Sequence, residues 1–209
     1  MGSEEIEMES TRLKQAYGRA DKVNMDDPTV EEFNGKIQPS AWVYSQRMKQ
    51  RLDQFQPNAG ELLQIAAYCQ HIKRWTLPRS SYPMNRAGYL GWREKLKTLH
   101  GDITQAIMLK SGYEEKEALR VRSLLGKKHL RSDPESQVLE DVICLVFLEH
   151  YLHNFSKKHD DEKVKSIIQK TWKKMSPRAR EAAMDIPFNL PDGRLIQGAL
   201  EQGHEDRLH

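Results

Sequence analysis

One acidic residue interrupts the most apolar helical pattern of the chain, which spans residues 135–154. Asp141 shares a helical face with three apolar residues at spacings of three, four and seven, namely Val138, Leu145 and Leu148. Because an unpaired charge in a core is costly, this carboxylate needs a cation, a metal ion or hydrogen-bond donors beside it. Two interpretations fit: a salt bridge with one of the many arginines, or a metal ligand or catalytic carboxylate.

His71 is a second candidate for chemistry, near the end of a helix predicted over residues 59–75. As a metal ligand it needs further histidines or carboxylates nearby. The sequence offers His100, Asp102, Asp141 and Glu149. The alternative is structural, because a protonated imidazole at a helix C-terminus is stabilised by the helix dipole.

Positive charge is concentrated in one third of the chain, between His71 and Arg131. This segment holds 14 Lys and Arg against 5 Asp and Glu, a net charge of +9, and the remaining residues together carry −6. Such a concentration indicates an anionic partner, with phosphate and nucleic acid as the usual candidates. A solvated helix face is the alternative explanation.

Arginines and aromatic residues are interleaved at the start of this basic segment. Guanidinium groups donate paired hydrogen bonds to phosphate, and aromatic planes stack on bases or on guanidinium groups. Two of the arginines lie in a proline-containing loop over residues 76–86, where internal packing explains them less well. The candidate substrate-binding residues are Arg74, Arg79, Arg86, Trp92, Arg93, Lys127 and Lys128. Cation–π packing on the surface would produce a similar set.

The elements that carry these residues are all predicted to be helices. A proline after Asp27, followed by acidic residues, indicates a short helix near residue 28. No segment alternates apolar and polar residues between turn signals, so no sheet is expected. The sequence therefore predicts an all-α fold of about seven helices. The longer helices are expected over residues 41–55, 59–75, 87–110 with interruptions at its glycines, 114–125, 135–154, 160–174 and 177–185.

A chain of 209 residues and 24.3 kDa is expected to form a single domain with loose ends. We predict a helical domain over residues 27–188, between a flexible N-terminal segment, residues 1–26, and a flexible C-terminal tail, residues 189–209. The longest apolar run has seven residues, well short of the roughly 18 that a membrane span requires. The acidic N-terminus and two cysteines without CxxC spacing favour a cytoplasmic protein with no membrane partner.

Two groups of motifs lie between about residues 26 and 188. The first comprises residues 70–75 (QHIKRW), Pro78-Arg79, Gly88-Tyr89 and Trp92-Arg93. The second comprises Asp133-Pro134-Glu135, residues 139–142 (LEDV) and residues 170–175 (KTWKKM). In these motifs the chain resembles the family described as domain of unknown function 4202, a resemblance that implies no particular activity.

A more distant resemblance concerns the order of the helices. Residues 44–48 (YSQRM) followed by residues 65–72 (IAAYCQHI) look like the opening of HD-domain phosphohydrolases. The helix around Asp141 falls where that superfamily places its last metal-binding aspartate. The resemblance implies an HD-like helical bundle and a metal ion that activates water against a phosphoester.

The ligand residues depart from the HD pattern. Tyr44 stands in place of the first histidine, and Gln70-His71 stands in place of the His-Asp pair. Of the four expected ligands only Asp141 keeps its identity. A rearranged site would use His71, His100 and Asp141 as catalytic and metal-ligating residues, with a divalent metal as the cofactor.

We therefore expect a protein that binds a phosphorylated small molecule, a nucleotide or another phosphoester, in a basic aromatic pocket. The enzyme hypothesis adds hydrolysis of that molecule by the degenerate HD-like site. The alternative hypothesis is a non-catalytic binding module for RNA or a phosphorylated ligand. Metal content and the salt dependence of RNA binding separate the two.

Overall fold

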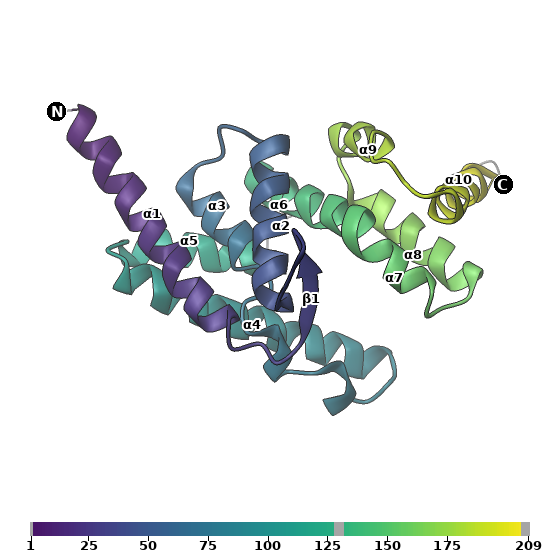
Figure 1. The fold of residues 1–209 in the computed structure, drawn as a ribbon, viewed down its shortest axis with the longest axis horizontal. Helices are drawn as coiled ribbons and strands as arrows, with labels where there is room; N and C mark the ends of the chain where they lie inside the picture. Colours follow the sequence, from purple (N-terminus) through teal and green to yellow (C-terminus); the bar gives the residue numbers. More distant parts are fainter. Residues whose placement is uncertain (1, 128–131, 206–209) are drawn as a thin grey trace. The chain divides into compact units, whose positions relative to one another are not determined.

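The computed structural model describes the backbone of residues 2–127 and 132–205 and the side chains of residues 11–127 and 132–201. It is mostly helical, as predicted (Figure 1). The chain divides into two compact units, Met1–Leu139 and Glu140–His209, where the sequence predicts one helical domain between loose ends. Each unit has buried apolar residues of its own.

The first unit joins most of the helices to one small hairpin. Its elements are α1 (Gly2–Asn24), β1 (Val30–Phe33), β2 (Lys36–Pro39), α2 (Ser40–Phe55), α3 (Glu61–Tyr68), the short 3₁₀ turns η1 (Arg74–Thr76) and η2 (Arg79–Ser81), α4 (Arg86–Lys110) and α5 (Glu115–Gly126). Helix α6 (Pro134–Val146) begins in this unit and continues into the second. The second unit also contains the π-helical turn η3 (Phe147–Tyr151), α7 (Leu152–Ser156), α8 (Asp161–Lys174), α9 (Pro177–Met184) and α10 (Leu190–Glu205).

Helix α1 occupies a segment that the sequence predicts to be flexible. Ala16, Ala20 and Asn24 are spaced four residues apart and are at most 1% exposed, so one face of the helix is buried. This helix packs against α3 and α4. The prediction missed it because alanine side chains bury little apolar surface and add little to a hydrophobic pattern. Helix α10 likewise lies in the predicted tail, where Ile196 and Ala199 are buried.

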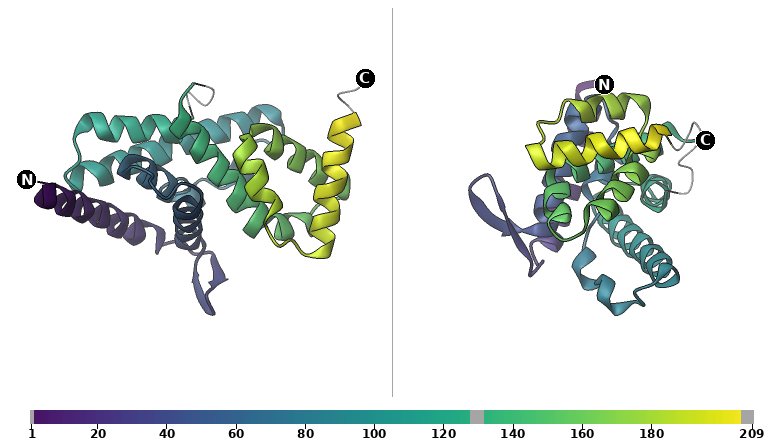
Figure 2. Two further views of the ribbon diagram at one scale, coloured as in Figure 1. Left: turned by 90° about the horizontal axis from the view of Figure 1, so that it is seen from above. Right: turned by 90° about the vertical axis from the view of Figure 1, so that its right-hand side faces the viewer.

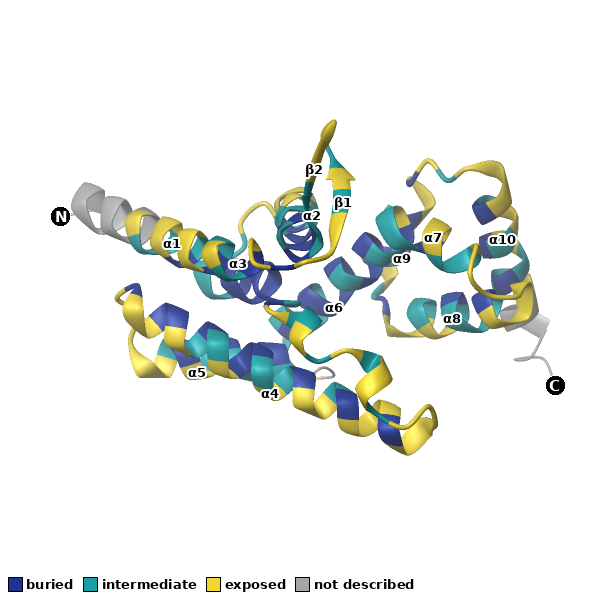
Figure 3. Cartoon of the chain, turned by 60° about the horizontal axis from the view of Figure 1, so that its bottom comes forward, coloured by how far each residue is buried: buried dark blue, intermediate teal, exposed yellow. Residues whose placement is uncertain are grey.

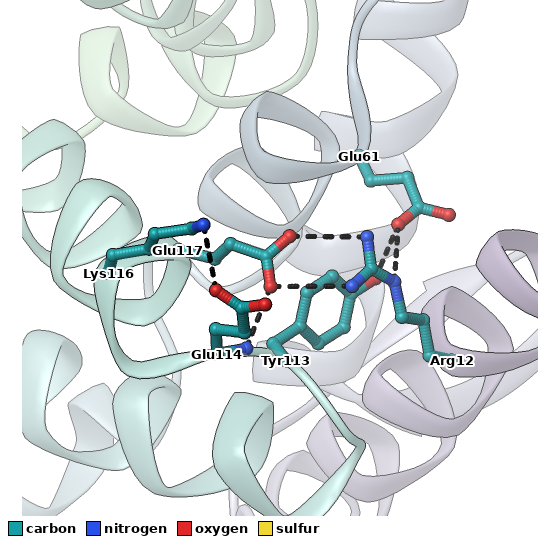
Figure 4. Close-up of polar contacts among 6 residues, drawn as sticks. All are labelled: Arg12, Glu61, Tyr113, Glu114, Lys116 and Glu117. Atoms are coloured by element: carbon teal, nitrogen blue, oxygen red, sulfur yellow. Dashed lines mark hydrogen bonds and ion pairs between the residues drawn. The ribbon is translucent and has the colours of Figure 1, made fainter.

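A polar network fixes α1 to two other helices (Figure 4). The guanidinium group of Arg12 forms ion pairs of 3.2 Å with Glu61 at the start of α3 and with Glu117 in α5. The same group lies over the ring of Tyr113, 4.2 Å from its centroid, and the Tyr113 hydroxyl donates a 2.9 Å hydrogen bond to Glu61. One cation therefore connects three helices.

The segment near residue 28 is a β-hairpin rather than the predicted helix. Asn34 and Gly35 have positive φ angles of 51° and 74°, the backbone of a tight two-residue turn. The Asp27 carboxylate accepts hydrogen bonds from the backbone N–H groups of Thr29 and of Ala41 in the first turn of α2. It therefore closes the base of the hairpin and caps α2 instead of a helix near residue 28. The prediction of a helix here is wrong, and the hairpin stands out from the helices around it (Figure 2).

Helix α4 is continuous although the sequence predicts interruptions at its glycines. A Cβ atom on Gly88 would lie 2.1 Å from the carbonyl oxygen of Pro83, and one on Gly101 would lie 3.0 Å from Cγ of Arg122 in α5. Both glycines therefore allow close approach of neighbouring segments rather than breaks in the helix. The Asn85 side chain caps the helix by accepting a 2.9 Å hydrogen bond from the Gly88 N–H.

The helices of the second unit begin largely where their caps predict. The Asp160 side chain accepts a hydrogen bond from the N–H of Lys163 at the start of α8, and Ser176 does the same for Ala179 in α9. Helix α10 packs against α7 and α8. Within the described residues, each helix is too short or too polar to cross a membrane.

Candidate functional site

His71 and Arg74 lie on the turn that follows α3, because α3 ends at Tyr68, earlier than predicted. Lys73, between them, has a left-handed backbone with φ of 54°. This conformation costs a residue other than glycine about 1 kcal/mol or more. The Lys73 N–H donates a 3.2 Å hydrogen bond to the side-chain oxygen of Asn24, which is fully buried. The turn that presents His71 and Arg74 is therefore held from α1.

Asn24 also connects the turn to α2 and α3. Its side-chain nitrogen donates to the hydroxyl of Ser45 over 3.0 Å, and that hydroxyl donates to the carbonyl oxygen of Tyr68 over 2.7 Å. Asn24 is not among the residues predicted to form the site. A polar residue within a polar segment gives no signal of burial, and only the three-dimensional contacts show its role.

Two histidines meet at this turn. The ring of His71 stacks on that of Tyr44, with centroids 3.8 Å apart and planes inclined by 19°. The ring of His100, from α4, lies 6.2 Å from the ring of His71. Nδ1 of His100 lies 2.7 Å from the carbonyl oxygen of Ile72, which assigns the proton of the neutral ring to Nδ1. Its Nε2 is buried and has no hydrogen-bond partner among the described residues.

Both histidines are neutral at pH 7. Burial, together with the positive charges of Arg74, Lys127 and Arg93 and the neighbouring His100 ring, holds the pKa of His71 well below its ordinary value. Burial is the main cause that lowers the pKa of His100 to about 4, with a smaller effect from Arg74. The lowered pKa values of both histidines indicate surroundings that exclude water and carry positive charge.

Two arginines of the site lie against aromatic rings. The guanidinium carbon of Arg74 is 4.7 Å from the ring centroid of Trp92, whose indole N–H donates a 2.8 Å hydrogen bond to the carbonyl oxygen of Leu77. Arg93 lies 5.8 Å from the ring centroid of Tyr89 and donates a 3.2 Å hydrogen bond to its hydroxyl. Burial and the charge of Arg93 both lower the pKa of Arg74. The two cations are therefore close enough to repel each other.

These cations differ from four other arginines of the first unit in their charge balance. Each of the following arginines forms an ion pair with at least one carboxylate: Arg12, Arg47, Arg120 and Arg122. Within the described part of the chain, Arg74 and Arg93 have no carboxylate partner. Their positive charge is thus concentrated without local compensation. We call Tyr89, Trp92, His71, Arg74, Arg93 and Lys127 the cation–aromatic cluster.

Arg79 lies over the same two rings, 6.0 Å from the centroid of Tyr89 and 5.9 Å from that of Trp92. Arg79 donates hydrogen bonds to the carbonyl oxygens of Tyr82, Pro83 and Asn85, so it holds together the loop between η1 and α4. Arg86 is exposed at the first position of α4. Lys127 ends α5 in a left-handed conformation and adds positive charge near His71. Lys128 lies outside the described residues.

Asp141 belongs to the second unit and is 2% exposed, so the prediction of a buried carboxylate with a polar partner is confirmed. Its carboxylate accepts a 2.8 Å hydrogen bond from the backbone N–H of Ser176, the N-cap residue of α9. Hydrogen-bond donors are among the partners that the sequence requires for this carboxylate, and this donor comes from the backbone. A backbone donor carries no sequence signature, which is why the pattern could not indicate it.

A divalent metal does not fit the residues around His71 as the structure arranges them. In the described residues no group of three or more His, Cys, Asp or Glu side chains is arranged to hold a metal ion. The charged neighbours of His71 are cations, which repel a metal ion. We therefore derive no reaction step through a metal, and the set of His71, His100 and Asp141 stays a prediction.

A comparison with family models matches residues 14–196 to the family described as domain of unknown function (DUF4202). The chain belongs to this family. The DUF4202 match begins within α1 and ends within α10, so it includes part of each of the two helices in the segments predicted to be flexible. No curated protein and no solved structure matches the chain.

Proposed function

We propose that this protein binds a phosphorylated small molecule at the cation–aromatic cluster of its first unit. The observation that supports this most is the juxtaposition of Arg74 and Arg93 beside His71, with no carboxylate among the described residues to balance them. Guanidinium groups donate paired, charge-assisted hydrogen bonds to phosphate oxygens. A bound phosphate would supply the missing negative charge and relieve the repulsion between the two arginines.

The proposal is tested by the affinity for inorganic phosphate and ribose 5-phosphate, measured by calorimetry in wild type and variants. Arg74→Ala and Arg93→Ala should each weaken both ligands, by roughly 10-fold or more for loss of a charge-assisted hydrogen bond. Arg122→Ala is the matched control, because Arg122 pairs with Asp102 and Gln105. Unchanged affinity in the Arg74 and Arg93 variants would contradict the proposal.

Hydrolysis of the bound phosphoester is the finer part of the proposal. The resemblance to the HD-domain order of helices supports it, as does the proximity of the His71 and His100 rings, whose centroids lie 6.2 Å apart beside Arg74. Of the residues predicted for this step, His71 and His100 lie in the first unit and Asp141 lies in the second. Purified protein should hold clearly less than one tightly bound metal per chain, because only one ligand of the usual HD set is retained.

The test of turnover is release of inorganic phosphate from a panel of nucleotides with added magnesium or manganese. Release that is lost in both His71→Ala and His100→Ala supports an enzyme. No release, with phosphate binding intact, identifies a binding module without turnover. An RNA oligomer that binds more tightly than every small phosphoester, with a steep salt dependence, would instead identify RNA as the partner.

A further inference from the structure

The side chains of the cation–aromatic cluster are arranged in order along α4. Tyr89, Arg93 and His100 follow one another at spacings of four and seven residues, so they share one stripe of the helix. The stripe begins exposed at Tyr89, is partly buried at Arg93 and ends buried at His100. A ligand anchored on this stripe therefore meets an aromatic ring at the outer end and positive charge further in.

Tyr89 is 42% exposed, although its ring lies beside two guanidinium groups and a second aromatic ring. The N-terminal end of α4, where it lies, is among the more exposed parts of the first unit (Figure 3). Its ring centroid is 5.9 Å from that of Trp92, and the guanidinium groups of Arg79 and Arg93 lie 6.0 Å and 5.8 Å from its ring centroid. These neighbours hold the ring in place, while much of its surface faces solvent.

We propose that the ligand is a nucleoside phosphate whose base stacks on Tyr89 while its phosphate binds Arg93 and Arg74. This inference rests on the proposed function and adds the class of ligand. One helical turn, about 6 Å, separates Tyr89 from Arg93, a spacing that a ribose can bridge between base and phosphate. Every base has a flat π surface, so stacking on a tyrosine needs no particular base. Tyr89 is then a specificity-determining residue for nucleotides over other phosphoesters.

The experiment compares the affinities of adenosine 5′-monophosphate, ribose 5-phosphate and inorganic phosphate by calorimetry, with tryptophan fluorescence as a second readout. Adenosine 5′-monophosphate should bind roughly 5- to 100-fold more tightly than ribose 5-phosphate, the range expected for one base stacked on an aromatic ring. Tyr89→Ala should remove that preference, so that adenosine 5′-monophosphate and ribose 5-phosphate bind with equal affinity within about twofold. Any loss that arises through Arg93, which donates to the Tyr89 hydroxyl, should affect both ligands equally. Tyr89→Phe keeps the ring and should keep the preference.

Leu90→Ala is the matched control, since Leu90 is the neighbouring exposed apolar residue, at 52% exposure. It should leave all three affinities unchanged. If ribose 5-phosphate binds as tightly as adenosine 5′-monophosphate, or if Tyr89→Ala keeps the preference, the base contact is wrong while phosphate binding stands. If none of the three ligands binds, both the proposed function and this inference are overturned.

Discussion

The buried carboxamide of Asn24, at the end of α1, accepts a 3.2 Å hydrogen bond from the backbone N–H of Lys73, whose left-handed backbone lies between His71 and Arg74. A strained residue persists only where its surroundings hold it, and such residues cluster at functional sites. Asn24 is thus a positioning residue for the cation–aromatic cluster, although it touches none of the charged groups proposed to bind phosphate.

Replacement of Asn24 tests this role. Asn24→Ala leaves the Lys73 N–H and the Ser45 hydroxyl without this partner, so the free energy of unfolding should fall by about 1 to 3 kcal/mol, as measured by urea denaturation. The ribose 5-phosphate affinity should fall as well. Asn24→Asp keeps an acceptor for the Lys73 N–H, so it should retain more of the affinity than Asn24→Ala. Equal affinity in wild type and Asn24→Ala would show that the turn holds its shape without the amide.

Stability should decrease as the pH falls from 6.5 to 4. The pKa of His100 is lowered by burial from 6.5 to about 4, so across this range the unfolded state binds a proton that the folded state does not. Stability therefore rises with pH in this window, and the full effect of His100 is on the order of 3 kcal/mol.

The measurement is urea denaturation at a series of pH values for wild type and His100→Asn. The variant should be less stable at pH 7, because His100 donates to the carbonyl oxygen of Ile72. It should also lose less stability between pH 6.5 and 4, with the remaining dependence due in part to His71. A His100 pKa near 6.5 by NMR would contradict this account.

Asp141 should stabilise the start of α9, because its carboxylate accepts a hydrogen bond from the backbone N–H of Ser176. Asp141→Ala leaves a donor without this partner and should cost about 1 to 3 kcal/mol of stability. Asp141→Asn keeps an oxygen acceptor and should cost less. Hydrogen exchange of the Ser176 amide should accelerate in the alanine variant. An exchange rate equal to that of the wild type would contradict this role of Asp141.

The Arg12 network should contribute to stability, because its ion pairs are partly shielded from solvent, with the Arg12 side chain 26% exposed. Arg12→Ala should lower the free energy of unfolding by about 1 kcal/mol, and high salt should reduce the difference. Lys116→Ala is the control, since the Lys116–Glu114 pair is exposed (Figure 4) and its loss should not be measurable. Equal effects of the two substitutions would refute a special role for Arg12.

The parts of the fold that the sequence predicted well are those with local signals. Asp160 and Ser176 mark helix starts through side-chain caps, and the apolar periodicity of residues 135–154 predicted α6 to α7 as one helical run. The prediction of a helix near residue 28 rested on the Asp-Pro pair and the acidic residues after it, whereas the Asn34-Gly35 pair that forms the hairpin turn was overlooked. Helix α1 was missed because its buried face consists of alanines and one asparagine.

The candidate site likewise has features that the sequence indicates and features that only the folded chain shows. Residue types alone indicated Arg74, Trp92 and Arg93, because cations interleaved with aromatic residues are conspicuous in a sequence. The charge balance that separates Arg74 from Arg120 depends on which carboxylates lie nearby, and this is a property of the folded chain. The role of Arg79 in holding its own loop also depends on backbone contacts that residue types do not indicate.

The most direct test of phosphate binding at the cation–aromatic cluster is an NMR titration that follows the side-chain Nε–H signals of the arginines as inorganic phosphate is added. The signals of Arg74 and Arg93 should shift together and saturate, because both guanidinium groups donate to the bound anion. Those of Arg120 and Arg122, which pair with carboxylates, should not move. Signals of Arg74 and Arg93 that stay unchanged, or that shift no more than those of the paired arginines, would contradict the account.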